Sequence, residues 1–349
     1  MARGVLAASH LARERCDTGR TEWSIVVTGQ AGHGAIVVGV DGSTSARQAL
    51  NWAVAEAVVA HQPLHIVHSF TGPLMDYPFV SSSSEPPDGG FEAAAERLLA
   101  DARKRATSAG SGIVKVTSEL VRGAPSSALL ARAHDAELLV VGGRGPDGFA
   151  GFAERSLGGA LAAHASCPLV VVPSTAGCDL RPAGGRIVAG VDRSHLPTEA
   201  IRFAFESAAR RQAALTAVWV WPSPMWGYPR LVTGIDSVEA VERHHLLRSL
   251  EAERRRFPQV RFEVKLVRHH HHVGKALVEE SEGAELLVLG RGRGGLAELL
   301  PGSVTHVVLE HAKCPVAVVG QQPATSGAKP AIPPAGSSAS RIAKQSARG

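Results

Sequence analysis

The sequence predicts an α/β protein in which one doubly wound domain is repeated in tandem. Three motifs of the first half return in the second at offsets of 151, 148 and 147 residues: IVVGVDGS from 36 returns as IVAGVDRS from 187, AELLVVGGRG from 136 as AELLVLGRGRG from 284, and HASCPLVVV from 164 as HAKCPVAVV from 311. A period of this length is a whole domain rather than a short structural repeat. Within each half, apolar runs alternate with helical patterns, which is the order of elements in a doubly wound sheet.

The strands are predicted from short runs that are apolar throughout, as expected for strands that a parallel sheet buries on both faces. The runs lie at residues 35–40, 63–70, 113–120, 137–142 and 168–172 in the first half, and at 186–191, 215–221, 261–267, 285–290 and 315–319 in the second. Helical patterns between them cover 46–60 and 92–109, with counterparts at 198–212 and 238–257. The sequence therefore predicts two tandem Rossmann-like or flavodoxin-like domains, each a five-stranded parallel sheet with helices on both faces.

The same landmarks divide the chain into five parts. We expect an N-terminal extension at 1–33, a first domain at 34–173, a linker at 174–185, a second domain at 186–320 and a tail at 321–349. The linker is rich in small and turn-forming residues, which fits an exposed connection. The tail is rich in Ala, Ser, Pro and Gly, so we expect it to be disordered, and we expect the extension to be flexible.

The net charge of +5 does not indicate a nucleic-acid partner. The tail carries no acid and four basic residues, which are Lys329, Arg341, Lys344 and Arg348. The two domains are therefore together close to neutral. No apolar run reaches the roughly 18 residues that a membrane span needs, and the N-terminal residues lack the order of a secretory signal. We therefore expect a cytoplasmic protein that binds neither nucleic acid nor membrane.

Neither the cysteines nor the histidines indicate a metal, redox or catalytic site. The four cysteines show no CxxC spacing, and Cys167 and Cys314 occupy equivalent positions before a predicted strand, where a small buried side chain is the simpler interpretation. The histidines at 269–272 replace the turn at 122–125 with two residues added. We interpret them as an expanded polar loop, since a metal site needs spaced ligands and supporting groups. Three further histidines are interpreted as structural: His68, His164 and His311.

Two segments follow predicted strands with residues that suit a ligand, since ligands of an open parallel sheet bind beyond the carboxyl ends of its strands. The first is the turn that begins with Asp41, matched by Asp192 in the second half. An acid there accepts hydrogen bonds from a nucleobase or a ribose, but Asp41 or Ser43 equally suits a cap of the following helix, and both readings stay open. The second segment is glycine-rich, at 142–159 and 290–304. Glycines let backbone amides approach phosphate oxygens, although such a loop also forms a tight turn without a ligand.

The order of VGVDGS, a strand–helix–strand run, RGAP, LLVVG, a glycine-rich loop and CPLVVV resembles the universal stress protein family in its tandem two-domain form. The resemblance covers about residues 34–173 and 184–320. It implies a five-stranded parallel sheet in each domain. Members with the pattern G-x2-G-x9-G-[S/T] after the fourth strand tend to bind ATP. In them, the acid after the first strand and a residue of the second strand hold the adenine, and the glycine loop holds ribose and phosphates.

Carried over, the resemblance implies nucleotide-binding residues in both halves: Asp41, Val67, Gly142, Gly145 and Ser156 in the first, and Asp192, Val218, Gly290, Gly292, Gly302 and Ser303 in the second. In the first half the family pattern requires a third glycine after Gly145, but Arg155 occupies that position. That side chain either hinders the approach of the backbone to a phosphate or pairs with the phosphate itself. In the second half the start of the pattern is one residue short, because Gly290 and Gly292 enclose only Arg291. Arg193 occupies the position after Asp192, where the family usually has glycine.

Three functional hypotheses follow. The first is a regulatory stress protein that binds ATP, with or without Mg²⁺, in one half or both, with little or no catalysis, because nothing supplies a clear catalytic base or a carboxylate pair for Mg²⁺. The alternative is a stress scaffold without nucleotide, acting through dimerisation and protein partners. An adenine-nucleotide hydrolase is disfavoured, since DGSTS at 41–45 differs from the SGGxDS-type loop of that group.

The resemblance also implies that the last strands of the halves meet as an intrachain pseudo-dimer, and that two chains form a homodimer.

Overall fold

A computed structural model of the chain describes residues 25–28, 34–70, 90–143, 157–174, 185–191, 198–222, 235–269, 272–291 and 303–320. The first half contains β2 (Ala35–Gly39), α1 (Thr44–Ala60), β3 (Leu64–Phe70), α2 (Gly90–Ala109), β4 (Val116–Arg122), α3 (Pro125–Ala133), β5 (Ala136–Gly142), α4 (Leu157–His164) and β6 (Leu169–Val172). The second contains β7 (Arg186–Val191), α5 (Thr198–Arg211), β8 (Ala214–Pro222), α6 (Ile235–Arg256), β9 (Phe262–His269), α7 (Val273–Glu280), β10 (Leu286–Gly290), α8 (Val304–His311) and β11 (Val316–Val319). A further strand, β1 (Ile25–Thr28), precedes both halves.

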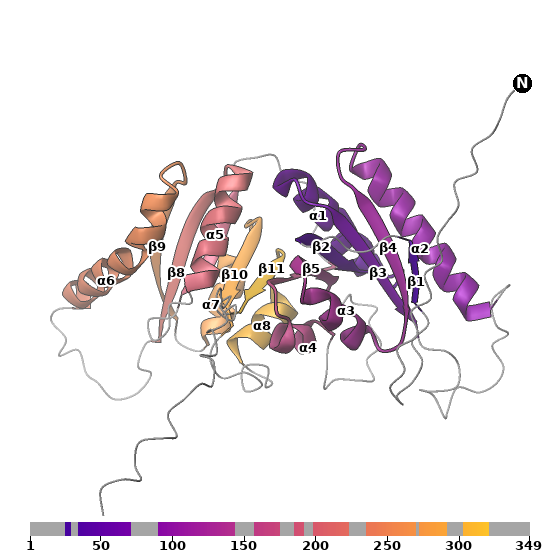
Figure 1. Ribbon diagram of the computed structural model, residues 1–349. Coiled ribbons are helices and arrows are strands. Elements are labelled where there is room, and N and C mark those ends of the chain that lie inside the picture. Colours follow the sequence, from indigo (N-terminus) through magenta and orange to yellow (C-terminus); the bar gives the residue numbers. More distant parts are fainter. Residues whose placement is uncertain are drawn as a thin grey trace, which may run out of the picture.

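Each half is built on a five-stranded parallel sheet, and the predicted fold class is confirmed. The strand order is β4-β3-β2-β5-β6 in the first half and β9-β8-β7-β10-β11 in the second, so the two orders are equivalent. Helices α1, α2, α5 and α6 pack on one face of the sheet and α3, α4, α7 and α8 on the other (Figure 1). Among the described helices, none combines the length and the hydrophobicity that crossing a membrane requires.

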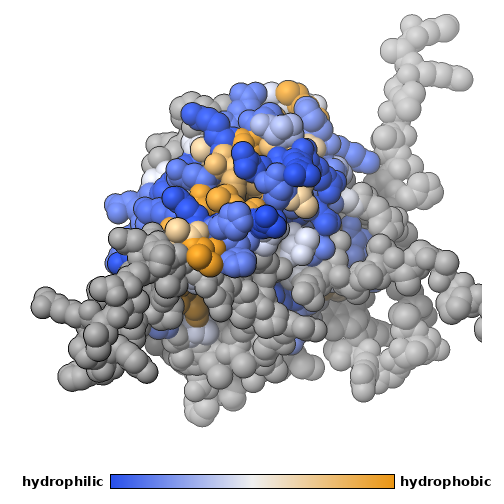
Figure 2. Space-filling view, turned by 90° about the vertical axis from the view of Figure 1, so that its left-hand side faces the viewer, coloured by the Kyte–Doolittle hydropathy of each residue, from blue (hydrophilic) through white to orange (hydrophobic). Residues whose placement is uncertain are grey.

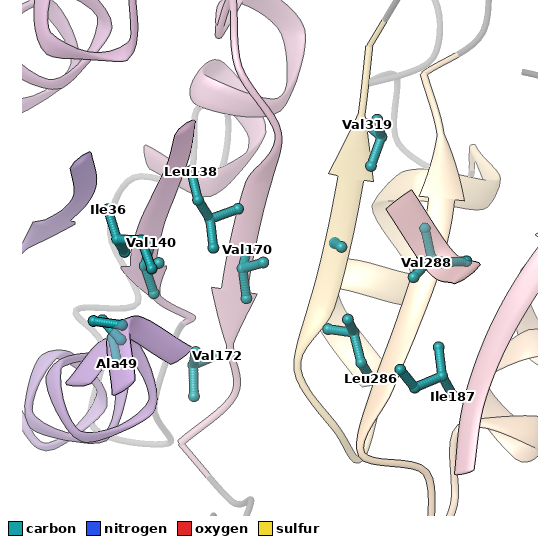
Figure 3. Close-up of a cluster of buried hydrophobic side chains, with 14 of the residues drawn as sticks. Ile36, Ala49, Leu138, Val140, Val170, Val172, Ile187, Leu286, Val288 and Val319 are labelled. Carbon is teal, nitrogen blue, oxygen red and sulfur yellow. The ribbon is translucent and has the colours of Figure 1, made fainter. Parts of the chain in front are cut away.

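The two halves join through their last strands into one eleven-stranded sheet. Strands β6 and β11 pair antiparallel, with Val170 opposite Ala317. The core continues across this junction, since Val170 and Val172 belong to the same buried cluster as Ile187 and Val319 (Figure 3). The expected meeting of the last strands is therefore observed, and the apolar surface that the halves bury against each other holds them together.

Helices α1 and α5 meet across the same junction and form an ion pair there. Glu56 of α1 is 4% exposed, and its carboxylate accepts a hydrogen bond from Arg211 and lies 3.5 Å from Nη2 of Arg210. The guanidinium of Arg211 also lies 5.5 Å from the ring centroid of Trp52. The position equivalent to Glu56 in the second half is Ser207. The contact therefore suits the pairing of two unlike halves and is not available to two copies of the same half.

Two local features differ from the sequence expectation. Strand β1 lies in the N-terminal extension, where no strand is predicted, and it pairs antiparallel with β4, with Val27 opposite Glu119. Strand β4 begins at Val116, later than the predicted 113–120. The reason is a turn in which Ser111 and Gly112 have φ values of 49° and 73°, and this turn leaves Ile113 68% exposed. The apolar character of Ile113 therefore does not reflect a buried strand.

Strand β9 is the outermost strand at the other end of the sheet. The carbonyl oxygen of Val264 in β9 accepts a hydrogen bond of 2.7 Å from Nη2 of Arg243 in α6. Figure 2 shows this end of the molecule, where hydrophilic side chains surround a smaller hydrophobic area. Charged side chains at an edge strand disfavour edge-to-edge pairing with other chains, so β9 is protected in part by α6.

The thiols of Cys167 and Cys314 are expected to resist alkylation in the native protein. Both are buried, and burial raises the pKa of Cys167 to about 12, which leaves little reactive thiolate. At pH 8 we expect labelling of Cys167 by a maleimide to be about a thousandfold slower than that of a free cysteine. Mass spectrometry of a variant with Cys16→Ser and Cys178→Ser checks this, with guanidinium-unfolded protein as the control. Rapid labelling of the native variant would contradict the burial.

Candidate functional site

The strand order reverses at the same place in both halves. The first and fourth strands of each half are neighbours, β2 beside β5 and β7 beside β10, while the intervening strands lie on the other side. In an open α/β sheet such a switch point forms a crevice beyond the carboxyl ends of the strands. Residues that end β2, β3 and β5 therefore belong to one candidate site, and those that end β7, β8 and β10 belong to its counterpart.

In the turn after β2, Ser43 caps α1 and Asp41 stabilises the turn itself. Ser43 is the N-cap of α1, and its Oγ accepts a hydrogen bond of 3.1 Å from the Ala46 N–H. Oδ1 of Asp41 accepts from the Ser43 N–H at 2.9 Å. The capping interpretation that the sequence left open is therefore correct for Ser43. It does not exclude the other interpretation for Asp41, because its carboxylate is exposed and each oxygen can accept further hydrogen bonds.

Val67 lies beside this turn in β3. Its carbonyl oxygen accepts a hydrogen bond of 2.9 Å from the Val40 N–H, which joins the ends of β2 and β3. Val67 as a whole is 2% exposed, so its side chain offers almost no surface to a ligand. The next residue, His68, is 9% exposed and places Nδ1 2.7 Å from the Val40 carbonyl oxygen. This partner agrees with the structural role that the sequence predicts for His68.

Gly142 ends β5 at the point where the first turn of α1 crosses it. A Cβ atom at Gly142 would lie 2.6 Å from the carbonyl carbon of Ser45 and 2.8 Å from the nitrogen of Ala46. Both contacts are with backbone, which cannot rotate away as a side chain can. Glycine is therefore required for the close packing of α1 on β5, whether or not a ligand binds. The same contact brings the N-terminal turn of α1 to the candidate site.

Arg47 is a residue at this edge that sequence reasoning missed. Its Nη1 donates to the Gly42 carbonyl oxygen at 2.7 Å, and its Nη2 donates to Oγ1 of Thr44 at 2.8 Å. The guanidinium therefore lies over the turn that begins with Asp41. The signal in the sequence was the spacing, because the fourth residue after the N-cap Ser43 lies one helical turn above it. The edge thus presents a carboxylate and a guanidinium close together.

In the second half, three of the predicted residues are described. Val218 is fully buried in β8 opposite Gly190, and Gly290 ends β10 opposite Val319. Ser303 is the N-cap of α8, where its Oγ accepts a hydrogen bond of 3.2 Å from the His306 N–H. The hydroxyl predicted to face a phosphate therefore also stabilises the start of a helix.

The other predicted residues lie outside the described part of the chain, and their roles remain predictions: Gly145, Arg155, Ser156, Asp192, Arg193, Gly292 and Gly302. Of the histidine run, His270 and His271 lie outside it as well. His272 is the N-cap of α7, and its Nδ1 accepts a hydrogen bond of 3.0 Å from the Gly274 N–H. Within the described residues, no group of three or more His, Cys, Asp or Glu side chains could hold a metal ion.

A buried charge network lies apart from these edges, between β3, β4 and α3. Glu119 accepts a hydrogen bond of 2.7 Å from Nε of Arg132 and one of 3.1 Å from Nε2 of His65. Burial alone would raise the pKa of Glu119, but the hydrogen bonds and charges of Arg132 and His65 outweigh it and lower that pKa to about 2. The hydrogen bond to Glu119 in turn raises the pKa of Arg132. We interpret this network as structural.

The second half repeats this ion pair with its charges exchanged. Glu119 lies opposite Val67, and the equivalent position opposite Val218 is Lys265. The partner of Lys265 is Glu280 of α7, with Nζ and Oε1 separated by 2.7 Å. The two halves therefore keep a strand-to-helix ion pair although neither residue is retained.

The chain is similar to proteins of one family throughout both halves. The model of the universal stress protein family matches residues 33–173 and 185–320. Universal stress protein Rv2005c of Mycobacterium tuberculosis is 32% identical over 298 residues, which are 83% of this chain and 97% of that protein. The crystal structure of a universal stress protein from Archaeoglobus fulgidus DSM 4304 covers 82% of this chain and 96% of its own, with a TM-score of 0.60 at 15% identity, a likeness of fold alone. A second protein from Archaeoglobus fulgidus, in complex with dAMP, covers 39% of this chain with a TM-score of 0.29, which is too distant to bear on a ligand of this chain.

Proposed function

Because this chain belongs to the universal stress protein family, we propose that it binds an adenine nucleotide and serves a regulatory role in a stress response, in the cytoplasm and with little or no catalysis. The proposed ligand is ATP, with or without Mg²⁺. Its place is the carboxyl edge between β2 and β5, or the matching edge of the second half. The proposed contacts are those of the predicted set: Asp41, Val67, Gly142, Gly145 and Ser156, and Asp192, Val218, Gly290, Gly292, Gly302 and Ser303.

The observation that carries the proposal is the convergence of Asp41, Val67 and Gly142 at one switch point. A hydrogen bond of 2.9 Å joins Val40 to Val67, and the close contact at Gly142 brings the first turn of α1 to the end of β5. The exposed carboxylate of Asp41 can accept hydrogen bonds from ribose hydroxyls or from an amino group. Arg47 and the N-terminal turn of α1 add positive potential at the same edge, which favours an anionic ligand.

The direct test is extraction of the purified, denatured protein followed by liquid chromatography for nucleotide. About one ATP or more per chain is expected to co-purify, and added ATP with Mg²⁺ is expected to raise the melting temperature. Asp41→Ala and Asp192→Ala then show which half holds ATP. The substitution in the half that binds ATP is expected to lower the affinity by about tenfold or more. An empty extract together with no thermal shift at millimolar ATP would exclude the proposal.

A matched variant separates ligand contact from local folding at Asp41. Asp41→Asn keeps a side-chain oxygen that can accept from the Ser43 N–H, so the turn is preserved while the charge is lost. Ser43→Ala removes the cap of α1 and leaves Asp41 in place. If Asp41→Asn keeps wild-type affinity while Ser43→Ala weakens ATP binding, the contribution of Asp41 is to the turn rather than to the ligand.

The second candidate function is a scaffold that binds no nucleotide and acts through dimerisation and protein partners. It is favoured by the structural reasons found for the described site residues, since Gly142 is explained by packing and Ser303 by capping. We propose a homodimer of chains under either function. Sedimentation velocity tests the homodimer, and the nucleotide extraction distinguishes the two functions, because only the first requires a bound nucleotide.

A further inference from the structure

Arg291 follows Gly290 in the second half, but its side chain reaches the first half. Nη2 donates to the Ala165 carbonyl oxygen at 2.7 Å and Nη1 to that of Ala163 at 3.3 Å. Its own N–H donates to the Val319 carbonyl oxygen at 2.7 Å. A Cβ atom at Gly320 would lie 2.9 Å from Cζ of Arg291, so the guanidinium rests against the main chain after β11. Arg291 is thus held between the halves.

The two carbonyls that Arg291 binds lie at the C-terminal end of α4. The last carbonyls of a helix have no partner within it, and their aligned dipoles favour a positive charge. A guanidinium satisfies two of them at once because its donors form a planar fork. Helix α4 begins at Leu157, directly after Ser156, a predicted phosphate contact of the first half. Arg291 therefore holds the far end of the helix that follows the predicted phosphate loop.

Among the described residues, the first half has no equivalent of this link. The position equivalent to Arg291 in the first half is Gly143, whose N–H makes the matching bond to the Val172 carbonyl oxygen at 2.7 Å. Glycine has no side chain with which to reach the end of α8, the helix equivalent to α4. The two halves therefore differ at the second residue of each glycine-rich segment: Arg291 supports α4 of the first half, and Gly143 cannot support α8 of the second.

We propose that Arg291 is a positioning residue for a nucleotide site in the first half, and that the first half is the one that binds. The inference rests on the proposed nucleotide binding. The arginine that interrupts the glycine pattern of the second half is used across the junction, where it fixes α4. An anion at the start of α4 and the guanidinium at its end both complement the dipole of this helix.

The test uses the full chain with Arg291→Ala, isothermal titration with ATP, and hydrogen exchange of the α4 amides without nucleotide. Arg291→Ala is expected to lower the affinity for ATP by about tenfold and to speed exchange in α4 by a similar factor. Arg291→Lys, which keeps the charge but not the fork, restores part of both. Arg211→Ala is the matched control, because it removes an arginine contact at the same junction between α1 and α5. It is expected to leave α4 exchange and ATP affinity unchanged.

Each result decides the proposal. Wild-type affinity in Arg291→Ala overturns it, and so does an equal loss in Arg211→Ala, which would indicate general loosening of the junction. Loss of ATP with Asp192→Ala but not with Asp41→Ala overturns the assignment to the first half. If the wild-type chain binds no ATP, the proposed function fails and the nucleotide part of the inference with it. Hydrogen exchange still shows separately whether Arg291 positions α4: unchanged exchange in Arg291→Ala refutes the positioning.

Discussion

Replacing Arg132 by alanine is expected to lower the free energy of unfolding by about 3 kcal/mol or more at pH 7. The side chain of Glu119 is 4% exposed, and Arg132 supplies two of its hydrogen bonds. Without the guanidinium, a charged carboxylate stays buried beside His65 alone, and the desolvation that Arg132 had offset is no longer compensated. Urea denaturation of the variant against wild type measures the effect.

The same network predicts a pH dependence with a definite sign. The pKa of Glu119 falls from an ordinary value of 4.5 to about 2 on folding, so the unfolded chain binds this proton more tightly. The stabilisation is fully present above pH 4.5 and is lost as the pH falls towards 2, with a total of about 3 kcal/mol. Glu119→Gln is expected to flatten the loss of stability between pH 5 and 2. An unchanged slope would show that other carboxylates dominate acid unfolding.

The second half supplies a matched control in the same molecule. Lys265 is equivalent to Glu119, but its side chain is 48% exposed, and its partner Glu280 also lies 3.6 Å from Nη1 of Arg186. Lys265→Ala is therefore expected to cost about 1 kcal/mol or less, as for other solvent-exposed pairs. Equal losses in Arg132→Ala and Lys265→Ala would mean that burial does not set the strength of these pairs.

Most of the fold could be predicted from the sequence because its determinants are local. Runs such as 35–40 and 186–191 are apolar throughout, and their repetition at a fixed offset fixes both the element order and the duplication. Strand β1 could not be predicted, since four residues carry too little pattern and their pairing with β4 is a long-range contact. The start of β4 was predicted too early because Ile113, which lies in a turn, is apolar and resembles the first residue of a strand.

The candidate site could be predicted only in part. Asp41 and Ser43 were found because a polar turn after a buried strand is visible in the sequence, but the division of their roles required geometry. Arg291 looks like a defect in the glycine pattern of its own half, because its partners lie 126 and 128 residues away at Ala165 and Ala163. No local pattern records a contact that forms only when the two halves meet.

Gly142→Ala is expected to destabilise the protein by about 2 kcal/mol or more even in the absence of nucleotide. The added methyl would lie 2.6 Å from the carbonyl carbon of Ser45 and 2.8 Å from the nitrogen of Ala46, so α1 has to move away from β5. Because the turn with Asp41 leads into α1, the same movement is expected to weaken ATP binding. Urea denaturation without nucleotide, followed by titration with ATP under native conditions, measures the two effects separately.

Gly143→Ala is the neighbouring control. A Cβ atom there would lie 3.3 Å from the Val172 carbonyl oxygen, a tight contact that a small shift relieves, so we expect a loss of about 1 kcal/mol or less. The comparison separates two reasons for a glycine at the end of β5. If Gly142→Ala keeps wild-type stability but loses ATP, the residue is glycine to admit a phosphate or ribose. If stability falls without nucleotide present, close packing of α1 on β5 already requires glycine, and its presence in the motif is then no evidence by itself that a ligand binds.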